Sequence, residues 1–509
     1  MLDTKSLTNI KTLGELKASG YQPKSVKEEL RANLIEKMRK KQDIFPGVLG
    51  YEETVIPDMQ RAILSRHNII LLGLRGQAKT RIARQMVDLL DEYIPIVEGS
   101  EMNDDPLEPI SRFARDLIAE KGDQTPVAWV HRSSRYVEKL ATPDVTVADL
   151  VGDVDPIKAA TMKLPYSDER VIHFGLIPRS HRSLFVINEL PDLQPRIQVA
   201  LFNVLQEGDI QIRGFSLRMP LDVQFVFTAN PEDYTNRGSI VTPLKDRIES
   251  QILTHYPKSI DLSKKITQQE ARLAKEQKEQ VVIDDLVATL TEQVAIEARD
   301  SEYVDEKSGV SARLTITAFE NLTSAVERRI ILSGEKVGYS RVGDLVGIVP
   351  SITGKIELVY EGEQEGAAIV AQKLISKSIR KVFVDYFPNP EKIKRNAPEN
   401  PYRSITQWFS KGNSLDLLSD MTEQEYKKQL DQVPGLGGLI KDYYKQLDTQ
   451  QKYLMMEFVL HGLAEYSLVG KGTLEAASGT QFKDLLSGML DMPDLDDDDD
   501  DYGGYYERG

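Results

Sequence analysis

The chain has 509 residues, 40% of them hydrophobic and 28% charged, which is ordinary for a globular protein of about three domains. It contains no cysteine, which excludes disulfides and cysteine nucleophiles, and its six histidines include no H-x-x-x-H pair, which argues against a histidine-based zinc site. Residues 491–509 hold eight aspartates, one glutamate and one arginine, so they carry −8 of the net −15. The remaining mildly acidic body lacks the basic surface of a duplex-binding protein, which makes nucleic acid an unlikely partner.

No targeting or membrane signal is evident in the sequence. The first residues lack the basic-then-apolar layout of a signal peptide. The longest apolar run, around residues 69–72, is far too short to span a bilayer. We therefore expect no membrane span and a cytoplasmic location.

Residue patterning divides the chain into five predicted segments. They are a helical N-terminal extension (1–44), an α/β core (45–258), a helical block (259–387), a mainly helical C-terminal region (388–490) and a disordered acidic tail (491–509). Within the first segment, Ser25 and Glu28 have the spacing of a capping box. Within the second, apolar runs at 68–72, 183–187 and 223–228 alternate with helical stretches. That alternation predicts a parallel sheet covered on both faces.

The run Gly-Leu-Arg-Gly-Gln-Ala-Lys-Thr at 73–80 matches the phosphate-binding loop G-x-x-x-x-G-K-[ST] and lies between a predicted strand and a helix over 79–90. Backbone N–H groups and the helix N-terminus favour an anion there. Lys79 is expected to reach the β- and γ-phosphates of ATP, and the Thr80 hydroxyl to ligate Mg²⁺. Ala78 replaces the usual glycine. We expect a near-helical backbone at Ala78, so that its methyl group is tolerated and Gly76 supplies the flexibility.

The predicted strand at 183–187 ends in Asn188-Glu189, where the usual pattern is Asp-Glu. Glu189 is placed to polarise the water that attacks the γ-phosphate. Asn188 stands where an aspartate normally supports Mg²⁺, and its neutral amide adds no negative charge. We therefore expect reduced metal affinity or reduced turnover. Taken alone, the pair reads as a polar strand end; the phosphate loop favours the functional reading.

Other polar residues complete the candidate site. Asn230 ends a third strand and can hold the attacking water, although an asparagine before a proline also suits a plain turn. Arg247 is a candidate for a neighbouring subunit's γ-phosphate, because arginine is always charged and forked. Arg182 has the same potential, and for either arginine a surface salt bridge is the simpler interpretation. Arg313 stands ahead of a helix in the second block and could fold over the nucleotide.

In this order, these elements resemble the AAA+ ATPases, and more narrowly the magnesium chelatase ATPase subunit and MoxR-like clade. The resemblance covers about residues 45–385. The segments that carry it are 45–51, 73–80, 175–189, 205–208, 228–230, 246–247 and 311–313. It implies an αβα core with a parallel sheet, followed by a helical lid. It also implies an oligomeric ring, with a hexamer favoured.

The resemblance further assigns roles to individual residues. The nucleotide-binding set it implies is Gly50, Tyr51, Gly73, Gly76, Gln77, Ala78, Lys79, Thr80 and Arg81, with the first two beside the adenine. Asn188 and Glu189 correspond to Walker B, Asn230 to sensor 1, Arg247 to the arginine finger and Arg313 to sensor 2. Segments 146–163 and 207–219 correspond to insertions that engage partners. Members of the family often work with a partner protein that carries a von Willebrand factor A domain. This chain shows no clear D-x-S-x-S motif of such a domain, so we expect the domain on another polypeptide.

Three functions follow as hypotheses. The first is an ATP-driven remodelling, chaperone-like or cofactor-insertion enzyme acting on a protein partner. The second is a nucleotide-gated scaffold that hydrolyses slowly, which Asn188 motivates. The third, disfavoured by the acidic body, is a DNA-acting motor, because ring helicases share the fold and fold alone does not give function.

Overall fold

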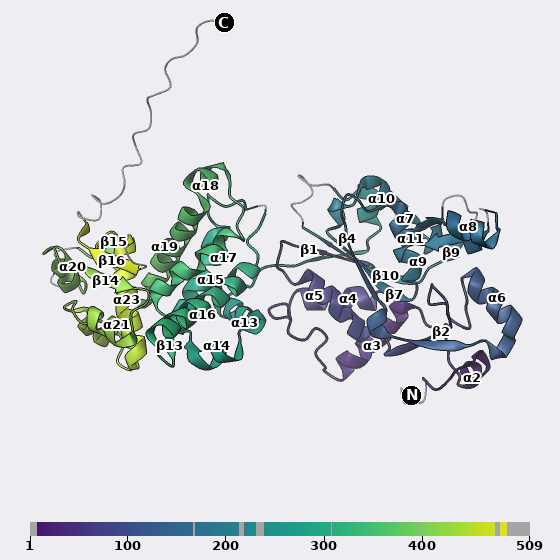
Figure 1. Ribbon diagram of the computed structural model, residues 1–509, viewed down its shortest axis with the longest axis horizontal. Helices are drawn as coiled ribbons and strands as arrows, with labels where there is room; N and C mark the ends of the chain where they lie inside the picture. The colour runs from purple at the N-terminus through teal and green to yellow at the C-terminus, as the bar shows by residue number, and fades with distance from the viewer. Residues whose placement is uncertain are drawn as a thin grey trace, which may run out of the picture. The chain divides into compact units, whose positions relative to one another are not determined.

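The computed structural model describes residues 8–165, 168–212, 218–230, 239–306, 308–394, 397, 399–473 and 479–485. It divides into two compact units, Met1–Lys258 and Ser259–Gly509, each described below by itself (Figure 1). The acidic tail at 491–509, predicted to be disordered, lies outside the described residues.

A five-stranded parallel sheet forms the centre of the first unit, in the order β11-β1-β10-β7-β4. Its strands are β1 (Ile69–Leu72), β4 (Tyr136–Leu140), β7 (Ser183–Asn188), β10 (Val223–Ala229) and β11 (Ser250–Leu253). The three inner strands are fully buried and coincide with the predicted apolar runs. The two edge strands bury few of their side chains, so their sequences carry no continuous apolar signal.

Alternate side chains of the inner strands enter two separate hydrophobic cores. Ile69, Leu71 and Val186 pack in one core, while Ile70 and Ile187 pack in the other. Helices cover the first face with α3 (Val26–Arg39), α4 (Val55–Leu64), α5 (Lys79–Gln85) and η1 (Met86–Leu89). The second face packs against α7 (Val147–Leu150), α9 (Leu176–Arg179), α10 (Pro195–Ala200), α11 (Phe202–Gln206) and α12 (Thr242–Asp246). The predicted αβα core with a parallel sheet is confirmed.

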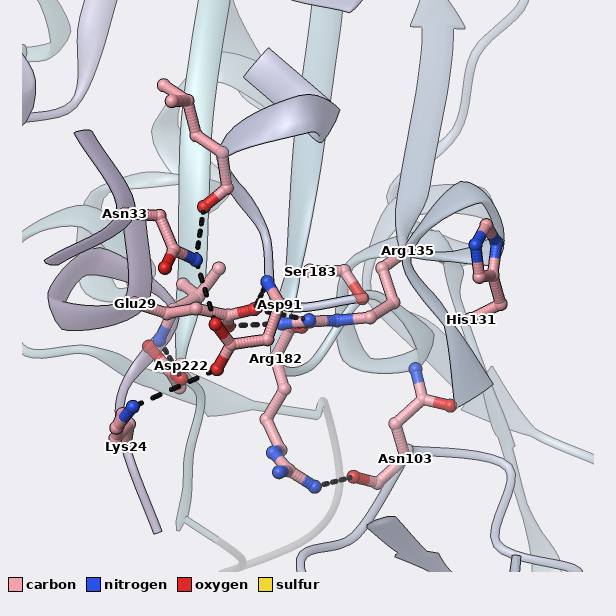
Figure 2. A network of polar contacts seen from close by, with 12 residues as sticks. Lys24, Glu29, Asn33, Asp91, Asn103, His131, Arg135, Arg182, Ser183 and Asp222 are labelled. Atoms are coloured by element: carbon pink, nitrogen blue, oxygen red, sulfur yellow. Dashed lines mark hydrogen bonds and ion pairs between the residues drawn. The ribbon is translucent and has the colours of Figure 1, made fainter. Parts of the chain in front are cut away.

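Helix α3 of the N-terminal extension begins with the predicted capping box, in which Ser25 and Glu28 cap each other's backbone. One turn later, Glu29 forms a two-pronged buried ion pair with Arg135, at the start of β4, with both N–O distances 2.7 Å (Figure 2). The extension also contains α2 (Leu13–Ala18). This ion pair fixes α3 against the sheet.

Apart from short 3-10 turns, the first unit also contains elements outside this sheet. They are the antiparallel pair β2 (Tyr93–Val97) and β3 (Val127–His131), α6 (Arg112–Lys121), the hairpin β5 (Gly152–Val154) with β6 (Ile172–Phe174), α8 (Pro156–Met162), and the hairpin β8 (Asp209–Gln211) with β9 (Arg218–Pro220). Lys158, Met162 and Met219, from the two predicted insertions, line a cavity of about 470 Å³ together with Phe113 of α6. Residues 213–217 of the second insertion lie outside the described residues.

The second unit is mainly helical. Its helices are α13 (Ile260–Glu270), α14 (Lys275–Gln280), α15 (Asp285–Arg299), α16 (Arg313–Ser333), α17 (Val349–Thr353), α18 (Tyr360–Glu365), α19 (Ala367–Tyr386), α20 (Arg403–Phe409), α21 (Glu423–Leu430), α22 (Leu436–Tyr443) and α23 (Thr449–Glu465). Two small sheets accompany them: β12 (Val281–Val282) with β13 (Gly338–Tyr339), and β14 (Leu415–Leu418), β16 (Gly479–Lys483) and β15 (Gly470–Thr473) in that order. One hydrophobic core includes Leu314, Phe383 and Phe458, so residues on both sides of position 388 share it.

Candidate nucleotide-binding site

The predicted phosphate loop joins the carboxyl end of β1 to the first turn of α5. Lys79, the first residue of α5, is buried at 7% exposure. Its ammonium group donates hydrogen bonds to the carbonyl oxygens of Gly73 and Leu74, the latter at 3.0 Å. A positive charge is thereby held over the loop, beside the helix N-terminus that favours an anion. Thr80 and Arg81 follow in the same turn, both half-buried.

The expected near-helical backbone at Ala78 is wrong. Ala78 has φ 57° and ψ 12°, in the left-handed region, and Gly76 also has a positive φ of 77°. A Cβ atom is unfavourable there, because it crowds the following carbonyl oxygen. The consensus glycine at this position therefore relieves backbone strain, and this chain carries that strain with alanine.

Gly73 stands where a side chain has no room. A Cβ atom at this position would collide with the Thr254 hydroxyl and the Gln77 side-chain oxygen. Thr254 follows β11, and its hydroxyl lies 2.7 Å from Gln77 Oε1 and 3.2 Å from the Leu72 carbonyl oxygen. The loop is therefore braced from the neighbouring strand, with Gln77 turned inward and buried.

Gly50 and Tyr51, predicted to lie beside the adenine, precede α4. The Tyr51 hydroxyl is 3.1 Å from the Gln77 carbonyl oxygen and 2.8 Å from that of His255, and burial raises the pKa of Tyr51 to about 12. The Gly50 N–H donates to Glu52 Oε1 at 3.1 Å. Tyr51 thus ties the segment before α4 to the phosphate loop, whereas the adenine contact stays a prediction.

Asn188 and Glu189 lie at the carboxyl end of β7, two strands from β1. The Asn188 Nδ2 donates to Glu138 Oε1 at 2.5 Å, and its Oδ1 accepts from the Thr228 hydroxyl at 3.1 Å. Glu189 has a left-handed backbone, with φ 55°, and its N–H donates to the Thr228 hydroxyl at 3.2 Å. Sequence reasoning missed Glu138, because an acidic residue in a half-buried edge strand gives no motif.

Asn230 follows β10, the strand between β1 and β7, and is 2% exposed. The Gly73 N–H donates to the Ala229 carbonyl oxygen at 3.1 Å, so the loop and the end of β10 are adjacent. Because the carboxyl ends of parallel strands share one edge of the sheet, the phosphate loop, Glu189 and Asn230 are brought to the same edge. Their chemical roles stay predictions.

The three candidate arginines have different surroundings. Arg247 is half-buried, donates to Gln206 Oε1 at 2.9 Å and lies over the Phe202 ring. Arg313 is exposed at the start of α16, in the second unit. Their roles as arginine finger and sensor 2 stay predictions.

Arg182 is neither a catalytic candidate nor a surface ion pair, contrary to both interpretations of the sequence. It precedes β7, at the strand end opposite Asn188, and is 5% exposed. Its guanidinium is 2.9 Å from the carboxylate of Asp105 and donates to the Pro95 carbonyl oxygen at 2.7 Å. It also donates to the Asn103 carbonyl oxygen at 3.3 Å (Figure 2). Arg182 therefore has a buried structural role.

The site fits a magnesium–nucleotide complex better than an all-protein metal cage. Among the described residues, no group of three or more histidine, cysteine, aspartate or glutamate side chains could hold a metal ion. Mg²⁺ commonly uses one or two protein oxygens and completes its shell with phosphates and water. Thr80, at the phosphate loop, and Asn188, at the end of β7, bear oxygen atoms that could hold such a complex. Within the described part of the chain, no helix has the length and apolar character needed to cross a membrane.

Comparison with known proteins gives distant relatives. No protein-family model matches the chain. It is 25% identical over 233 residues to magnesium-chelatase subunit ChlI-1 of Arabidopsis thaliana, which covers 45% of this chain and 51% of that protein. It is 26% identical over 201 residues to the magnesium-chelatase 38 kDa subunit of Cereibacter sphaeroides, which covers 38% and 52%. The chain thus spans about half the length of these relatives.

Among solved structures, the complex of the BchI and BchD subunits of magnesium chelatase aligns with 19% identity and a TM-score of 0.32, over 63% of this chain and 98% of that chain. The sequence relatives include magnesium-chelatase subunits from both a plant and a bacterium. The parallel sheet carries its phosphate loop where the ordered motifs require it, and the sequence is similar to magnesium-chelatase ATPase subunits, in agreement with the AAA+ resemblance of its motifs.

Proposed function

We propose that the chain binds and hydrolyses ATP with Mg²⁺, and that it does so as a homo-oligomeric ring acting on a protein partner. The observation that carries the proposal is the buried Lys79, whose ammonium group lies over the loop between β1 and α5. The end of β7 brings Glu189 to the same edge of the sheet. The predicted cytoplasmic location rests on the sequence.

Hydrolysis requires few covalent steps from the protein. A water oxygen attacks the γ-phosphorus, the bond to the bridging oxygen of ADP breaks, and the water proton passes to a base. Glu189 is the proposed base, and Asn230 the residue that orients the water. Lys79 and Arg247 balance negative charge on the phosphates, the latter from a neighbouring subunit. Bound Mg²⁺ would supply additional positive charge at the phosphate oxygens.

The partner is proposed to dock on the two insertions of the first unit. Lys158, Met162 and Met219 of the insertions form part of the lining of a cavity of about 470 Å³, and α8, which carries Met162, also exposes Ile157. Exposed apolar side chains beside a cavity suit a protein ligand. The resemblance of the motifs to the magnesium chelatase and MoxR-like clade suggests, for this chain, a partner of the von Willebrand factor A type. Remodelling, chaperone-like work or cofactor insertion are the outcomes we propose for that contact.

A slowly hydrolysing, nucleotide-gated scaffold is the second candidate. It is favoured by the neutral amide of Asn188 at the position where a carboxylate normally supports the metal. The steady-state rate of ATP hydrolysis decides between the two candidates, since sustained turnover by the purified chain contradicts the scaffold.

The proposal predicts different defects for two variants of the full chain. Lys79→Ala should abolish nucleotide binding, because the buried charge over the loop is lost. Glu189→Gln should bind ATP like the wild type and lose hydrolysis by at least about a hundredfold, since the carboxylate that accepts the proton is gone. Binding is measured by calorimetry and hydrolysis by phosphate release, with the exposed Lys121→Ala on α6 as control. Normal ATP binding by Lys79→Ala contradicts the assignment.

A further inference from the structure

Polar side chains from three adjacent strands form a continuous hydrogen-bonded row on one face of the central sheet. The Thr228 hydroxyl of β10 donates to Asn188 Oδ1 at 3.1 Å. The Asn188 Nδ2 of β7 donates to Glu138 Oε1 of β4 at 2.5 Å. The row therefore ends on a carboxylate that stands directly beside the amide at the Walker B position.

This row faces the helix that carries the phosphate-loop residues. Val186, two residues before Asn188, packs in the same core as Ile82 of α5, so Asn188 and Glu138 share that face. Arg84 of α5 donates its Nε–H to Glu138 Oε2 at 3.0 Å. Arg84 follows Thr80 by four residues, which places both on the same side of α5, about 6 Å apart along its axis. Glu138 is thereby connected to the helix side that bears the proposed Mg²⁺ ligand.

The Glu138 carboxylate is held in place by three donors. Besides Asn188 and Arg84, the Tyr136 hydroxyl donates to Oε2 at 3.0 Å. Burial and the neighbouring carboxylate raise the pKa of Tyr136, so the phenol remains a donor. The side chain of Glu138 is 22% exposed, so it is neither free at the surface nor sealed in the core. A fixed, partly accessible carboxylate can contribute charge to an adjacent metal site.

We propose that Glu138 supplies the negative charge that Asn188 lacks, so that β4 rather than β7 carries the carboxylate of the magnesium–nucleotide site. The inference rests on the proposed ATP-binding function. Glu138 acts as a positioning residue: its Oε1 holds the Asn188 amide, and its charge, shared with the Arg84 guanidinium on Oε2, lies directly beside that amide. Mg²⁺ prefers such hard oxygen groups, and a carboxylate beside a ligand typically tunes metal affinity.

This arrangement predicts an unusual result for the substitution that restores the common Walker B residue. Asn188→Asp alone would place a second carboxylate within 2.5 Å of Glu138. Two carboxylates at this distance do not both ionise readily, so the single substitution should impair the site. Adding Glu138→Gln restores one charge and one hydrogen bond, because the glutamine amide can donate to the new aspartate. The pair then carries its single charge on β7.

The experiment measures binding of a fluorescent ATP analogue to the full chain, first in EDTA and then in a Mg²⁺ titration. Glu138→Gln should keep the EDTA affinity and raise the Mg²⁺ concentration needed for half-maximal effect by about 10–100-fold. The double variant Asn188→Asp/Glu138→Gln should return that concentration close to the wild-type value. Tyr136→Phe, which removes one donor and keeps the charge, is the matched control and should change it little.

Two results overturn the inference. One is a wild-type Mg²⁺ requirement in Glu138→Gln. The other is a double variant that folds, as judged by circular dichroism, and binds in EDTA but has the same raised requirement as Glu138→Gln. A wild-type chain that binds no nucleotide in either condition contradicts the proposed function itself, and is thereby distinguished from a failure of the Glu138 assignment.

Discussion

Ala78 has a backbone conformation that ordinarily belongs to glycine. Its φ of 57° lies in the left-handed region, immediately before the residue that holds the phosphate-binding charge. For a residue with a Cβ atom, this conformation costs about 1–2 kcal/mol. Thr254 and Tyr51 brace the loop through Gln77, and these contacts offset the strain.

Ala78→Gly should therefore raise the free energy of unfolding. The strain relieved, about 1–2 kcal/mol, is partly offset by the added entropy of the unfolded chain, about 0.4–1 kcal/mol, which leaves a net gain of about 0–1.6 kcal/mol. Thermal or urea unfolding of the full chain measures this difference. Ala32→Gly, at an exposed position inside α3, is the matched control and should lose about 1 kcal/mol. A loss of stability in Ala78→Gly similar to that control contradicts the strain argument.

At the level of single residues, the phosphate loop could be predicted from the sequence, because each of its residues has a fixed spacing from a strand and a helix. The backbone conformation of Ala78 could not be predicted, since the sequence does not distinguish a helical from a left-handed alanine before Lys79. The position of Glu138 beside Asn188 could not be predicted from the sequence. It depends on the pairing of β4 with β7, which joins residues about 50 positions apart. Arg182 resembles a catalytic arginine in sequence, and only its buried contacts with Asp105 reveal its structural role.

Helix α3 is attached to the sheet at two points. Glu29 pairs with Arg135, and the Val26 N–H at the first turn donates to Asp222 Oδ2 at 2.7 Å. Asp222 lies just before β10, and removal of its carboxyl from water raises its pKa to about 6 (Figure 2). Its own N–H donates to His181 Nδ1 at 3.0 Å, and burial lowers the pKa of His181 to about 4.

The stability of the fold should depend on pH through Asp222. Its folded-state pKa is raised, so the folded chain binds the proton more tightly than the unfolded chain. The resulting stabilisation is present below about pH 4 and is lost as pH rises through about 6, with at most about 3 kcal/mol involved. The lowered pKa of His181 makes a contribution of opposite sign over the same pH interval. The two contributions therefore partly cancel in the total unfolding free energy plotted against pH.

Asp222→Asn isolates the carboxyl. The difference in unfolding free energy, wild type minus variant, should fall as pH is raised from 4 to 6.5 and then become constant. Urea unfolding at a series of pH values gives this difference directly. A difference that is flat over that interval, or that rises, contradicts the assignment.

At the scale of elements, the capping box of α3 and the three inner strands follow from the sequence, because their signals are local and burial is complete. The edge strands β4 and β11 do not, since half-buried side chains leave no periodic pattern. The helix predicted over 79–90 is α-helical only to Gln85 and continues as a 3-10 turn. Helices α15 and α16 lie within the predicted helical block at 259–387.

At the scale of the whole molecule, the resemblance covers about residues 45–385, while the hydrophobic core of the second unit continues to Phe482. Residues beyond position 388 therefore stabilise the same core as the helical block before it. Sequence periodicity could not reveal this, because it reports the face that a helix buries and not the partner that covers it. The small sheet of β14, β15 and β16 was likewise not predicted, because its strands lie in a region expected to be mainly helical.

We propose that this chain hydrolyses ATP at the phosphate loop, with the site completed by Arg247 of a neighbouring copy. Mixing two inactive full-length variants tests it most directly. Lys79→Ala lacks a working loop and Arg247→Ala lacks the proposed finger, and each alone should be at least about a thousandfold slower than wild type. In a mixed ring, some interfaces pair an intact loop with an intact Arg247. ATP hydrolysis should therefore reappear on mixing and be greatest near equal proportions of the two variants. A mixture no faster than the sum of its components, or an Arg247→Ala variant with the wild-type rate, would contradict it.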